Sequence, residues 1–310
     1  MALLPSPPTP TLAAIYAAYE AETGDGFREH LGASQIGKEC ERALWFGFRW
    51  VTHAAWSGRM LRLFETGQRE EQRLVRDLRR SGATVLDLDP ATGRQWRVEA
   101  LGGHFGGSLD AVAIGLLEAP RTWHVLEFKT SATQTFNELR LRGVRQAKPR
   151  HYAQIQIYLH LTGFTRAMYI VVCKETDEIY LERVPADPAE GGRLLAKAER
   201  VIKAQHPPAR ISEDPDFWVC RLCEHHGVCH GEAAAERTCR SCLHATPVEG
   251  GWHCARWSWH PDPDEQRAGC PQHLYIPDLV PGEVTDVGDD WVDYRMADGS
   301  LWRDTGRNAA

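Results

Sequence analysis

Charged residues interrupt two apolar stretches near the middle of the chain, and their types suit metal-assisted chemistry. Asp110 stands directly before the run AVAIGLL, and Glu127 and Lys129 lie within HVLEFKT. Side chains alternate between the two faces of a strand, so Glu127 and Lys129 share one face while Phe128 points to the other. Burying charge is costly unless a partner compensates for it. The two stretches therefore predict neighbouring strands that bring two acids and a lysine to one site.

Convergent carboxylates supply the oxygen ligands that a hard divalent cation such as Mg²⁺ or Mn²⁺ prefers. Such a cation lowers the pKa of a bound water molecule and neutralises charge that develops on a phosphate. Lys129 would then steady the attacking hydroxide or the scissile phosphate. An acid and a lysine two residues apart are also common on exposed strands, so the pair needs support from the rest of the chain.

Two further motifs, one on each side of these strands, provide that support. The stretch HYAQIQIYLHLTG contains Gln154 and Tyr158, whose spacing puts both side chains on one face of a helix. The stretch LFETGQREE contains Gly67 and Glu71, with Glu70 as an alternative acid. The sequence therefore presents an acid on an early helix, two acids and a lysine on strands, and a polar pair on a later helix.

In this order the motifs resemble the RecB-like branch of the PD-(D/E)XK nuclease superfamily, over about residues 30 to 230. The resemblance implies an α/β fold, with a restriction-endonuclease-like mixed sheet flanked by helices. It implies that Mg²⁺ or Mn²⁺ is bound by Glu71, Asp110, Glu127 and the backbone carbonyl of Phe128. It also assigns Lys129 to the nucleophilic water, and Gln154 and Tyr158 to the positioning of the metal site and DNA.

A first cysteine set closes this region. FWVCRLCEHHGVCHG supplies Cys220, Cys223 and Cys229, and Cys40 is the candidate for a fourth thiolate. One subgroup of the RecB-like branch, which includes CRISPR-adaptation and AddB-type nucleases, holds an iron–sulfur cluster with one early and three late cysteines. The chain resembles this subgroup, which implies a [4Fe–4S] cluster that closes a loop of about 180 residues. Thiolates also suit Zn²⁺, and three histidines compete as its ligands: His225, His226 and His230.

A second cysteine set follows in a segment poor in aliphatic residues, which needs a metal to stabilise it. Its spacing is typical of a structural Zn²⁺ site. The expected ligands are four cysteines, with His273 as the alternate: Cys239, Cys242, Cys254 and Cys270. The ninth cysteine, Cys173 in the apolar run YIVVCKE, is expected to be buried and inert.

The net charge of −6 is unevenly distributed. Residues 278–310 hold eight acids and three bases, which leaves the remainder close to neutral. A local basic patch can attract phosphate even when the overall charge is negative. The stretch ELRLRGVRQAKPRH supplies the candidates for DNA binding: Arg140, Arg142, Arg145, Lys148 and Arg150. A solvated helix face is the alternative interpretation of the same stretch.

The elements that must position these residues follow from periodicity and breaker residues. Helices are expected at 11–31, 58–81, 134–147, 149–162 and 188–205, with Ser34 capping a further short helix. Short strands and hairpins are expected over 83–130, then strands at 166–173 and 179–184. This order predicts one mixed sheet with helices packed on it. The expected units are a nuclease domain at 1–232, a Cys/His zinc-binding module at 233–279 and an acidic β-hairpin tail at 280–310.

The chain has no apolar run long enough to span a membrane, and its first residues lack the basic region of a signal peptide. We therefore expect a cytoplasmic protein, in which clustered cysteines bind metal. The leading hypothesis is a Mg²⁺- or Mn²⁺-dependent exonuclease that acts on single-stranded DNA or DNA ends in recombination, repair or phage DNA processing. Recombination or replication proteins are candidate partners. The alternatives are a non-catalytic DNA-binding subunit with structural metal clusters and a zinc-dependent interaction scaffold.

Overall fold

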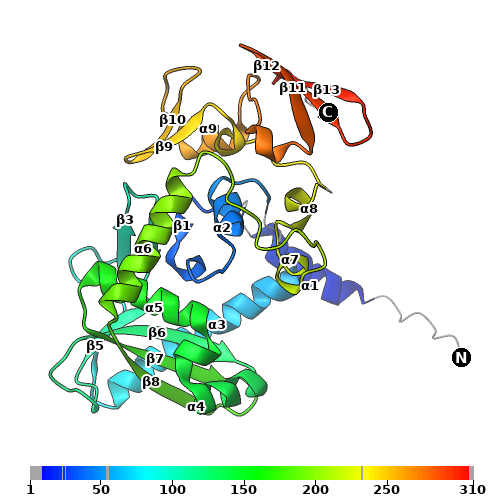
Figure 1. The fold of residues 1–310 in the computed structure, drawn as a ribbon. Coiled ribbons are helices and arrows are strands. Elements are labelled where there is room, and N and C mark those ends of the chain that lie inside the picture. The colour runs from blue at the N-terminus through cyan, green and yellow to red at the C-terminus, as the bar shows by residue number, and fades with distance from the viewer. Residues whose placement is uncertain (1–8, 23, 25, 54–55, 232, 307–310) are drawn as a thin grey trace, which may run out of the picture.

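The protein is a mixed α/β structure built around a five-stranded sheet, and Figure 1 shows this sheet at one end of the molecule. The computed structural model describes residues 9–22, 24, 26–53, 56–231 and 233–306. The strand order is β2-β5-β6-β7-β8, in which β6 and β7 are parallel and the other neighbours antiparallel. The bounds are Thr84–Leu86, Ala111–Ile114, His124–Ser131, Arg166–Cys173 and Ile179–Pro185.

Helices cover both faces of this sheet because its central strands are apolar on both sides. Leu126 and Phe128 of β6 pack on one face with Leu74 and Val75 of α3 (Gly58–Arg80). Val125 of β6 packs on the other face with residues of α4 (Thr133–Ala147) and α5 (Pro149–Thr162). The two faces thus alternate along β6 as its pattern predicts, and both are buried.

A further layer of helices links the sheet to the C-terminal part of the chain. Helix α6 (Pro188–Lys203) packs on α5, where a Cβ at Gly191 would lie 2.7 Å from Cβ of His160. Helix α2 (Glu41–Phe48) lies against the end of α6, and Nε1 of Trp45 donates a hydrogen bond to the carbonyl of Ala204 at 2.9 Å. A small sheet, β1-β4-β3, lies beside them, with bounds Leu31–Gly32, Phe105–Ser108 and Arg97–Ala100.

The C-terminal part forms the opposite end of the molecule from the five-stranded sheet (Figure 1). Two short helices, α7 (Trp218–Arg221) and α8 (His226–Cys229), precede it. It contains a 3-10 helix η2 (Cys239–Ser241), the hairpin β9 and β10 (Ala245–Val248, Gly251–Cys254), α9 (Pro263–Ala268) and η3 (Pro277–Leu279). Three antiparallel strands end it: β11 (Gly282–Gly288), β12 (Trp291–Met296) and β13 (Leu301–Asp304).

The hydrophobic core runs without interruption from the N-terminal part into the cysteine-rich part. Cys242 and Trp252 belong to the same buried cluster as Trp45 and Phe48 of α2. Two buried arginines reinforce this contact. The guanidinium of Arg240 lies 3.7 Å from the ring centroid of Trp50 and donates to the carbonyl of Glu29 at 2.9 Å. Arg49 donates to the carbonyl of Ala245 at 2.9 Å.

Most expected elements are confirmed, but the first helix is shorter than expected. Helix α1 spans Pro10–Ala21, and residues 31–32 form β1, which pairs in parallel with β4. The glycines at 24 and 26 interrupt the helical pattern, and Gly26 has a positive φ of 72°. Ser34 does not cap a helix. It lies inside the 3-10 helix η1 (Ala33–Gln35), and Cys40 is the N-cap residue of α2.

The acidic tail is a three-stranded sheet, so the expected hairpin was incomplete. Asp298 accepts a hydrogen bond from the backbone of Ser300 at 2.9 Å, and this turn returns the chain as β13. Residues 1–8, the boundary after residue 232 and residues 307–310 lie outside the described residues, so the predicted unit limits there stay predictions. In the part of the chain that is described, no helix is long and apolar enough to cross a membrane.

Candidate active site

Asp110 and Glu127 occupy facing positions on neighbouring strands. Ala111 pairs with Leu126 across β5 and β6, and Asp110 lies one residue before that pair. Oδ2 of Asp110 accepts a hydrogen bond from the backbone N–H of Phe128 at 2.6 Å. The strands therefore bring the two acids together as the sequence predicts, and this hydrogen bond fixes the first carboxylate to the strand that carries the second.

Lys129 compensates the buried charge of Glu127. The Glu127 side chain has no exposed surface, and the ammonium of Lys129 donates a hydrogen bond to its Oε1. The same ammonium lies 3.2 Å from the carbonyl oxygen of Phe128. Asp110 and Lys129 line a cavity. Glu127 lies beneath Lys129, which separates the Glu127 carboxylate from that cavity.

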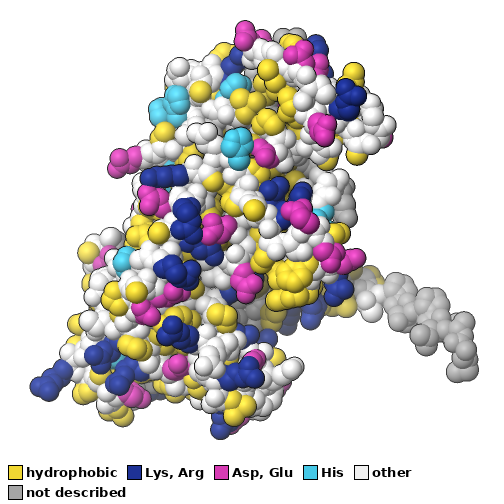
Figure 2. Space-filling view, in the orientation of Figure 1, with side chains coloured by type: hydrophobic (Ala, Val, Ile, Leu, Met, Phe, Trp, Pro, Cys, Tyr) yellow, Lys and Arg dark blue, Asp and Glu magenta, His cyan; other side chains and the backbone are white. Residues whose placement is uncertain are grey.

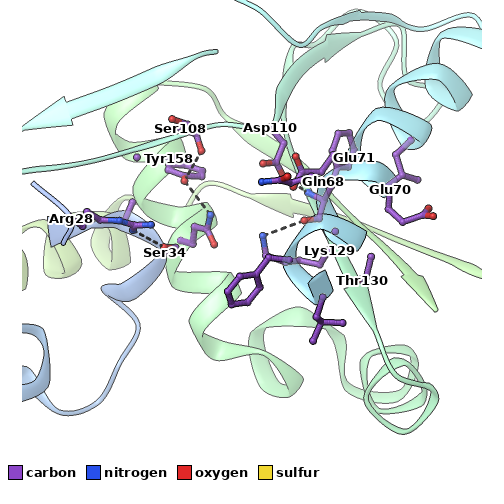
Figure 3. A pocket seen from close by; sticks show the side chains of 18 of the residues that line it. Arg28, Ser34, Gln68, Glu70, Glu71, Ser108, Asp110, Lys129, Thr130 and Tyr158 are labelled. Carbon is purple, nitrogen blue, oxygen red and sulfur yellow. Dashed lines mark hydrogen bonds between the residues drawn. The ribbon is translucent and has the colours of Figure 1, made fainter. Parts of the chain in front are cut away.

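That cavity has a volume of about 770 Å³ and lies between α3 and the strands. Glu70 and Glu71 of α3 both line it, and Figure 3 shows Glu71 near Asp110 and Glu70 directed away from it. Glu70 also forms an ion pair with Arg73 at 3.5 Å. The geometry therefore favours Glu71 over Glu70 as the third acid of the site.

Gln154 and Tyr158 join the site from α5. Nε2 of Gln154 donates to Oε2 of Glu127 at 3.2 Å and to the hydroxyl of Tyr158 at 3.1 Å. The Tyr158 hydroxyl in turn donates to the carbonyl of Ser108 at 2.8 Å. Gln154 and Tyr158 therefore connect the carboxylate of Glu127 by hydrogen bonds to the backbone of Ser108, at the end of the strand that precedes Asp110.

Burial and mutual repulsion make the acids of this site hold protons more tightly than usual. Burial, aided by the charge of Asp110, raises the pKa of Glu71 to about 7. Burial also raises the pKa of Glu127 and of Asp110, although Lys129 opposes both shifts. Burial lowers the pKa of Lys129, but the charges of Glu127 and Asp110 outweigh it, so the net shift is upward. A cation placed among these acids would relieve their repulsion.

The opposite wall of the cavity holds polar and basic residues that the sequence did not single out. Arg28 donates a hydrogen bond to Ser34 at 3.4 Å, and both lie across the cavity from Glu71 (Figure 3). His30 and Lys174 also line it. Arg28 lies in no recognisable sequence motif. Lys174 directly follows β7, which is parallel to β6, and the ends of parallel strands are a usual place for ligand contacts.

The basic stretch does not reach this cavity. Arg140 and Arg142 pair with Glu178 and Glu138, each at 3.5 Å, on the exposed side of α4. The guanidinium of Arg145 lies 5.3 Å from the ring centroid of Tyr152.

Lys148 and Arg150 of the same stretch lie elsewhere, and line the cavity beside the first cysteine set. Figure 2 shows another group of basic side chains over α6. The exposed bases of this helix pair with acids: Arg193 with Glu190, Arg200 with Glu41 and Lys203 with Glu199.

The four cysteines of the first set line the same cavity, and their metal binding stays a prediction. Cys40, Cys220, Cys223 and Cys229 are free thiols that line one cavity of about 1050 Å³. Burial raises the pKa of Cys220, and the neighbouring Cys229 and Cys40 raise it further.

The histidines beside the first set have other contacts. Nδ1 of His225 lies 2.6 Å from the hydroxyl of Thr52, and Nδ1 of His226 lies 3.0 Å from the carbonyl of Cys220. The rings of His226 and His230 have their centroids 4.9 Å apart, and both residues line the cavity.

The second cysteine set surrounds a much smaller void, of about 20 Å³, lined by Cys239, Cys242, Cys254 and Cys270 together with His244 and His273. Burial and the other three thiols raise the pKa of Cys239 to about 12. Cys173 lies apart from both sets, is fully buried at the end of β7 and lies 3.5 Å from the hydroxyl of Thr133.

No three His, Cys, Asp or Glu side chains in the described ranges stand as a preformed metal-ligand set. The donor chemistry nevertheless fits a divalent cation at the carboxylates. The Phe128 carbonyl already contacts a cation, the ammonium of Lys129, and the repulsion among Asp110, Glu127 and Glu71 raises their affinity for positive charge. A metal ion would require Lys129 to turn away from Glu127.

No family model and no curated protein matches this chain. Three solved structures are similar at 16% sequence identity. LHK-Exo in complex with dAMP has a TM-score of 0.42, covering 61% of this chain and 90% of its own. SSO0001 has a TM-score of 0.41, covering 72% and 95%. The alkaline exonuclease LHK-Exo from Laribacter hongkongensis has a TM-score of 0.38, covering 61% and 90%.

Proposed function

We propose that the protein is a deoxyribonuclease that depends on Mg²⁺ or Mn²⁺, with a restriction-endonuclease-like core of the RecB-like PD-(D/E)XK type. One observation carries the proposal: Asp110 and Glu127 face each other on adjacent strands, Asp110 lines an open cavity, and Lys129 lies between Glu127 and that cavity. Glu71 adds a third acid from α3. Burying the Glu127 carboxylate costs folding free energy, and a protein that only binds DNA has no need for such an acid.

Asp110, Glu127, Glu71 and the carbonyl of Phe128 would hold the metal ion. When bound, Mg²⁺ or Mn²⁺ supplies a water molecule of lowered pKa and neutralises charge on a phosphate. Beside Glu127 and Asp110 the pKa of Lys129 is raised. As an ammonium, Lys129 would donate a hydrogen bond to a phosphate oxygen or to the attacking hydroxide. Gln154 holds Oε2 of Glu127 in place.

Arg28 and Ser34 provide the phosphate-facing wall of the cavity in this proposal, and Lys174 lines the same cavity. Arg28 and Ser34 lie across the cavity from Glu71, where a positive side chain can hold the DNA backbone while the scissile phosphate meets the metal site. Arg28 is exposed and reaches Ser34 across a long hydrogen bond of 3.4 Å, so it can turn toward a ligand at little cost.

Exonuclease action on DNA ends, in recombination, repair or phage DNA processing, is the finer part of the proposal. Its support is the motif order and the placement of the first cysteine set. We assign a [4Fe–4S] cluster to Cys40, Cys220, Cys223 and Cys229, with Zn²⁺ as the alternative. The four free thiols around one large cavity support a thiolate-bound group of either kind.

The test is cleavage of labelled linear and covalently closed circular DNA by the purified protein with Mn²⁺, with Mg²⁺ and with EDTA. The proposal predicts loss of label from linear DNA with either metal and no reaction in EDTA. Resistance of closed circles would support end-dependent action, and nicking of circles would replace it with endonuclease action. Intact linear DNA under all three conditions would overturn the proposed function.

A further inference from the structure

We propose that one structural zinc ion is bound by Cys239, Cys242, Cys254 and Cys270. His273 would donate a hydrogen bond to a thiolate ligand without binding the zinc ion itself. The zinc ion would also hold the buried Arg240 in place. The inference does not depend on the proposed nuclease activity. It rests on how separate segments converge on one void, on the size of that void and on one buried histidine nitrogen.

The first three cysteines are brought together by turns and by the β9–β10 hairpin. The backbone N–H of Cys242 donates to the carbonyl of Cys239 at 3.1 Å, so the two cysteines flank a tight turn at η2. The carbonyl of Cys242 accepts from Ala245 at 3.2 Å, and Ala245 pairs directly with Cys254 across the hairpin. Cys254 therefore faces the turn that carries the first two thiols.

A close backbone approach brings Cys270 to the same place. Gly269 has a positive φ of 63°, and a Cβ there would lie 2.8 Å from the carbonyl oxygen of Arg237. Only glycine fits at this position. The contact places Gly269, which precedes Cys270, beside Arg237, two residues before Cys239. The thiol of Cys239 also donates a weak hydrogen bond to the carbonyl of Glu265 in α9, at 3.6 Å.

The size of the void distinguishes a single ion from a cluster. The void among these cysteines is about 20 Å³, which is close to the space of one water-sized sphere. Four thiolates around one such sphere suit tetrahedral Zn²⁺. A cluster of several irons and sulfides has no room there, whereas the cavity of the first set, about 1050 Å³, sets no such limit.

His273 lines the same void and is best placed as a supporting residue. Its ring is 1% exposed, Nε2 lies 3.1 Å from the hydroxyl of Ser241, and Nδ1 has no hydrogen-bond partner among the described residues. A protonated Nδ1 can donate to a thiolate sulfur, which bears charge only once the metal is bound. Residues that orient metal ligands in this way commonly change metal affinity without abolishing binding.

The zinc site would also hold a buried contact between the C-terminal part and the rest of the chain in place. Arg240 lies between Cys239 and Cys242, and its guanidinium stacks on Trp50 and donates to carbonyls of Glu29 and Phe48. A metal ion bound by Cys239 and Cys242 would hold η2 in place, and with it the Arg240 side chain.

Metal binding requires the thiols to turn toward the void, because they do not form a complete ligand set in the described structure. Each of the four Cys–SH groups gives its proton to the solvent as a Zn–S bond forms. Cys239 gives up its hydrogen bond to Glu265 in this step.

The test is metal content and cobalt substitution of the full-length protein. Wild type, Cys254→Ser, Cys270→Ser and His273→Asn are compared, with Cys173→Ser, outside both cysteine sets, as the control. We expect the first two variants to hold one zinc ion per chain fewer than wild type and Cys173→Ser. Co²⁺ in that site should give the intense visible absorption of tetrahedral thiolate ligation. His273→Asn should keep the metal with roughly 10- to 100-fold weaker affinity.

A second measurement needs only the wild-type protein, so it tests the site even if the variants do not fold. Wild-type protein is alkylated with and without a zinc chelator, and modified cysteines are located by mass spectrometry. We expect all four thiols to be protected until the chelator is added. Equal alkylation of Cys254 and Cys270 in both samples would overturn the site, as would iron, and not zinc, that is lost on Cys254→Ser or Cys270→Ser. Complete zinc loss in a folded His273→Asn variant would make His273 a ligand and overturn the four-cysteine assignment.

Discussion

Oδ2 of Asp110 accepts a hydrogen bond of 2.6 Å from the backbone N–H of Phe128, the residue between Glu127 and Lys129. The first carboxylate is thereby fixed by the backbone of the strand that carries the second carboxylate and the lysine. This backbone contact limits the rearrangement that Asp110 itself would need on metal binding. Lys129, whose ammonium is hydrogen-bonded to Glu127, would have to move.

Removing the charge of Asp110 should weaken metal binding without loosening the strands. In Asp110→Asn the side-chain oxygen can still accept from Phe128, while one anionic ligand is lost. We expect Mn²⁺ affinity, measured by the electron paramagnetic resonance signal of free Mn²⁺, to fall by at least about 100-fold, beyond the range seen for residues that only orient ligands. Asp264→Asn, at a side chain 94% exposed, is the matched control and should bind as wild type does. Unchanged affinity in Asp110→Asn would remove this residue from the metal site.

The stability of the metal-free protein should fall as the pH rises toward neutrality. Burial and the charge of Asp110 raise the pKa of Glu71 from its usual value of 4.5 to about 7. Between these values the folded chain binds more protons at Glu71 than the unfolded chain does, so the free energy of unfolding decreases with pH. Burial acts in the same direction at Glu127.

Calorimetric unfolding in EDTA between about pH 4.5 and about 7, the range set by the two pKa values of Glu71, would measure this slope. Glu71→Gln should flatten the slope, whereas Glu178→Gln, at a carboxylate 55% exposed, should not. Mn²⁺ should raise the melting temperature more at the upper end of the range, where the acids are ionised. Identical slopes for wild type and Glu71→Gln would contradict the prediction.

Two neighbouring buried glutamines on α5 should respond differently to truncation. Gln154→Ala removes the hydrogen bond to Glu127, and we expect Mn²⁺ affinity to fall roughly 10- to 100-fold. Gln156 bonds instead to the carbonyl of Pro185 at 3.0 Å and to the amide of Asp187 at 2.7 Å. Gln156→Ala should therefore cost about 1–3 kcal/mol of stability and leave Mn²⁺ affinity unchanged. Equal effects on metal affinity would show that Gln154 has no specific role.

Truncating Arg240 should destabilise the whole chain, because this residue lies between its N-terminal and C-terminal parts. Arg240→Met leaves the carbonyls of Glu29 and Phe48 without their donor, at a cost of about 1–3 kcal/mol for each unsatisfied group. Arg193→Met, at an exposed ion pair with Glu190, should change stability by less than about 0.5 kcal/mol. Denaturant unfolding of both variants measures the difference. Equal stabilities would contradict a structural role for Arg240.

The acids and the lysine of the site could be predicted because local rules place them. Strand alternation puts Glu127 and Lys129 on one face, and the helical spacing puts Gln154 beside Tyr158. Arg28 and Ser34 could not be predicted. They reach the cavity through the parallel pairing of β1 with β4, a contact between segments about 70 residues apart that has no local signal.

The buried arginines escaped prediction for a related reason. Arg49 and Arg240 look like surface residues in the sequence, yet each is 2% exposed, because aromatic rings and backbone carbonyls replace their water. The same contacts make the core continuous across the expected boundary after residue 232. The first helix ends earlier than expected because glycines at 24 and 26 interrupt it, and residues 31–32 instead pair with β4.

The central claim is that Glu127 binds the metal ion that supports DNA cleavage. The most direct test compares the rate at which wild type and Glu127→Gln degrade labelled linear DNA in Mn²⁺, with Glu178→Gln as the control and circular dichroism as the check of folding. We expect Glu127→Gln to fold and to cleave at least about 100-fold more slowly, while Glu178→Gln cleaves as wild type does. A folded Glu127→Gln that cleaves at the wild-type rate would contradict the central claim.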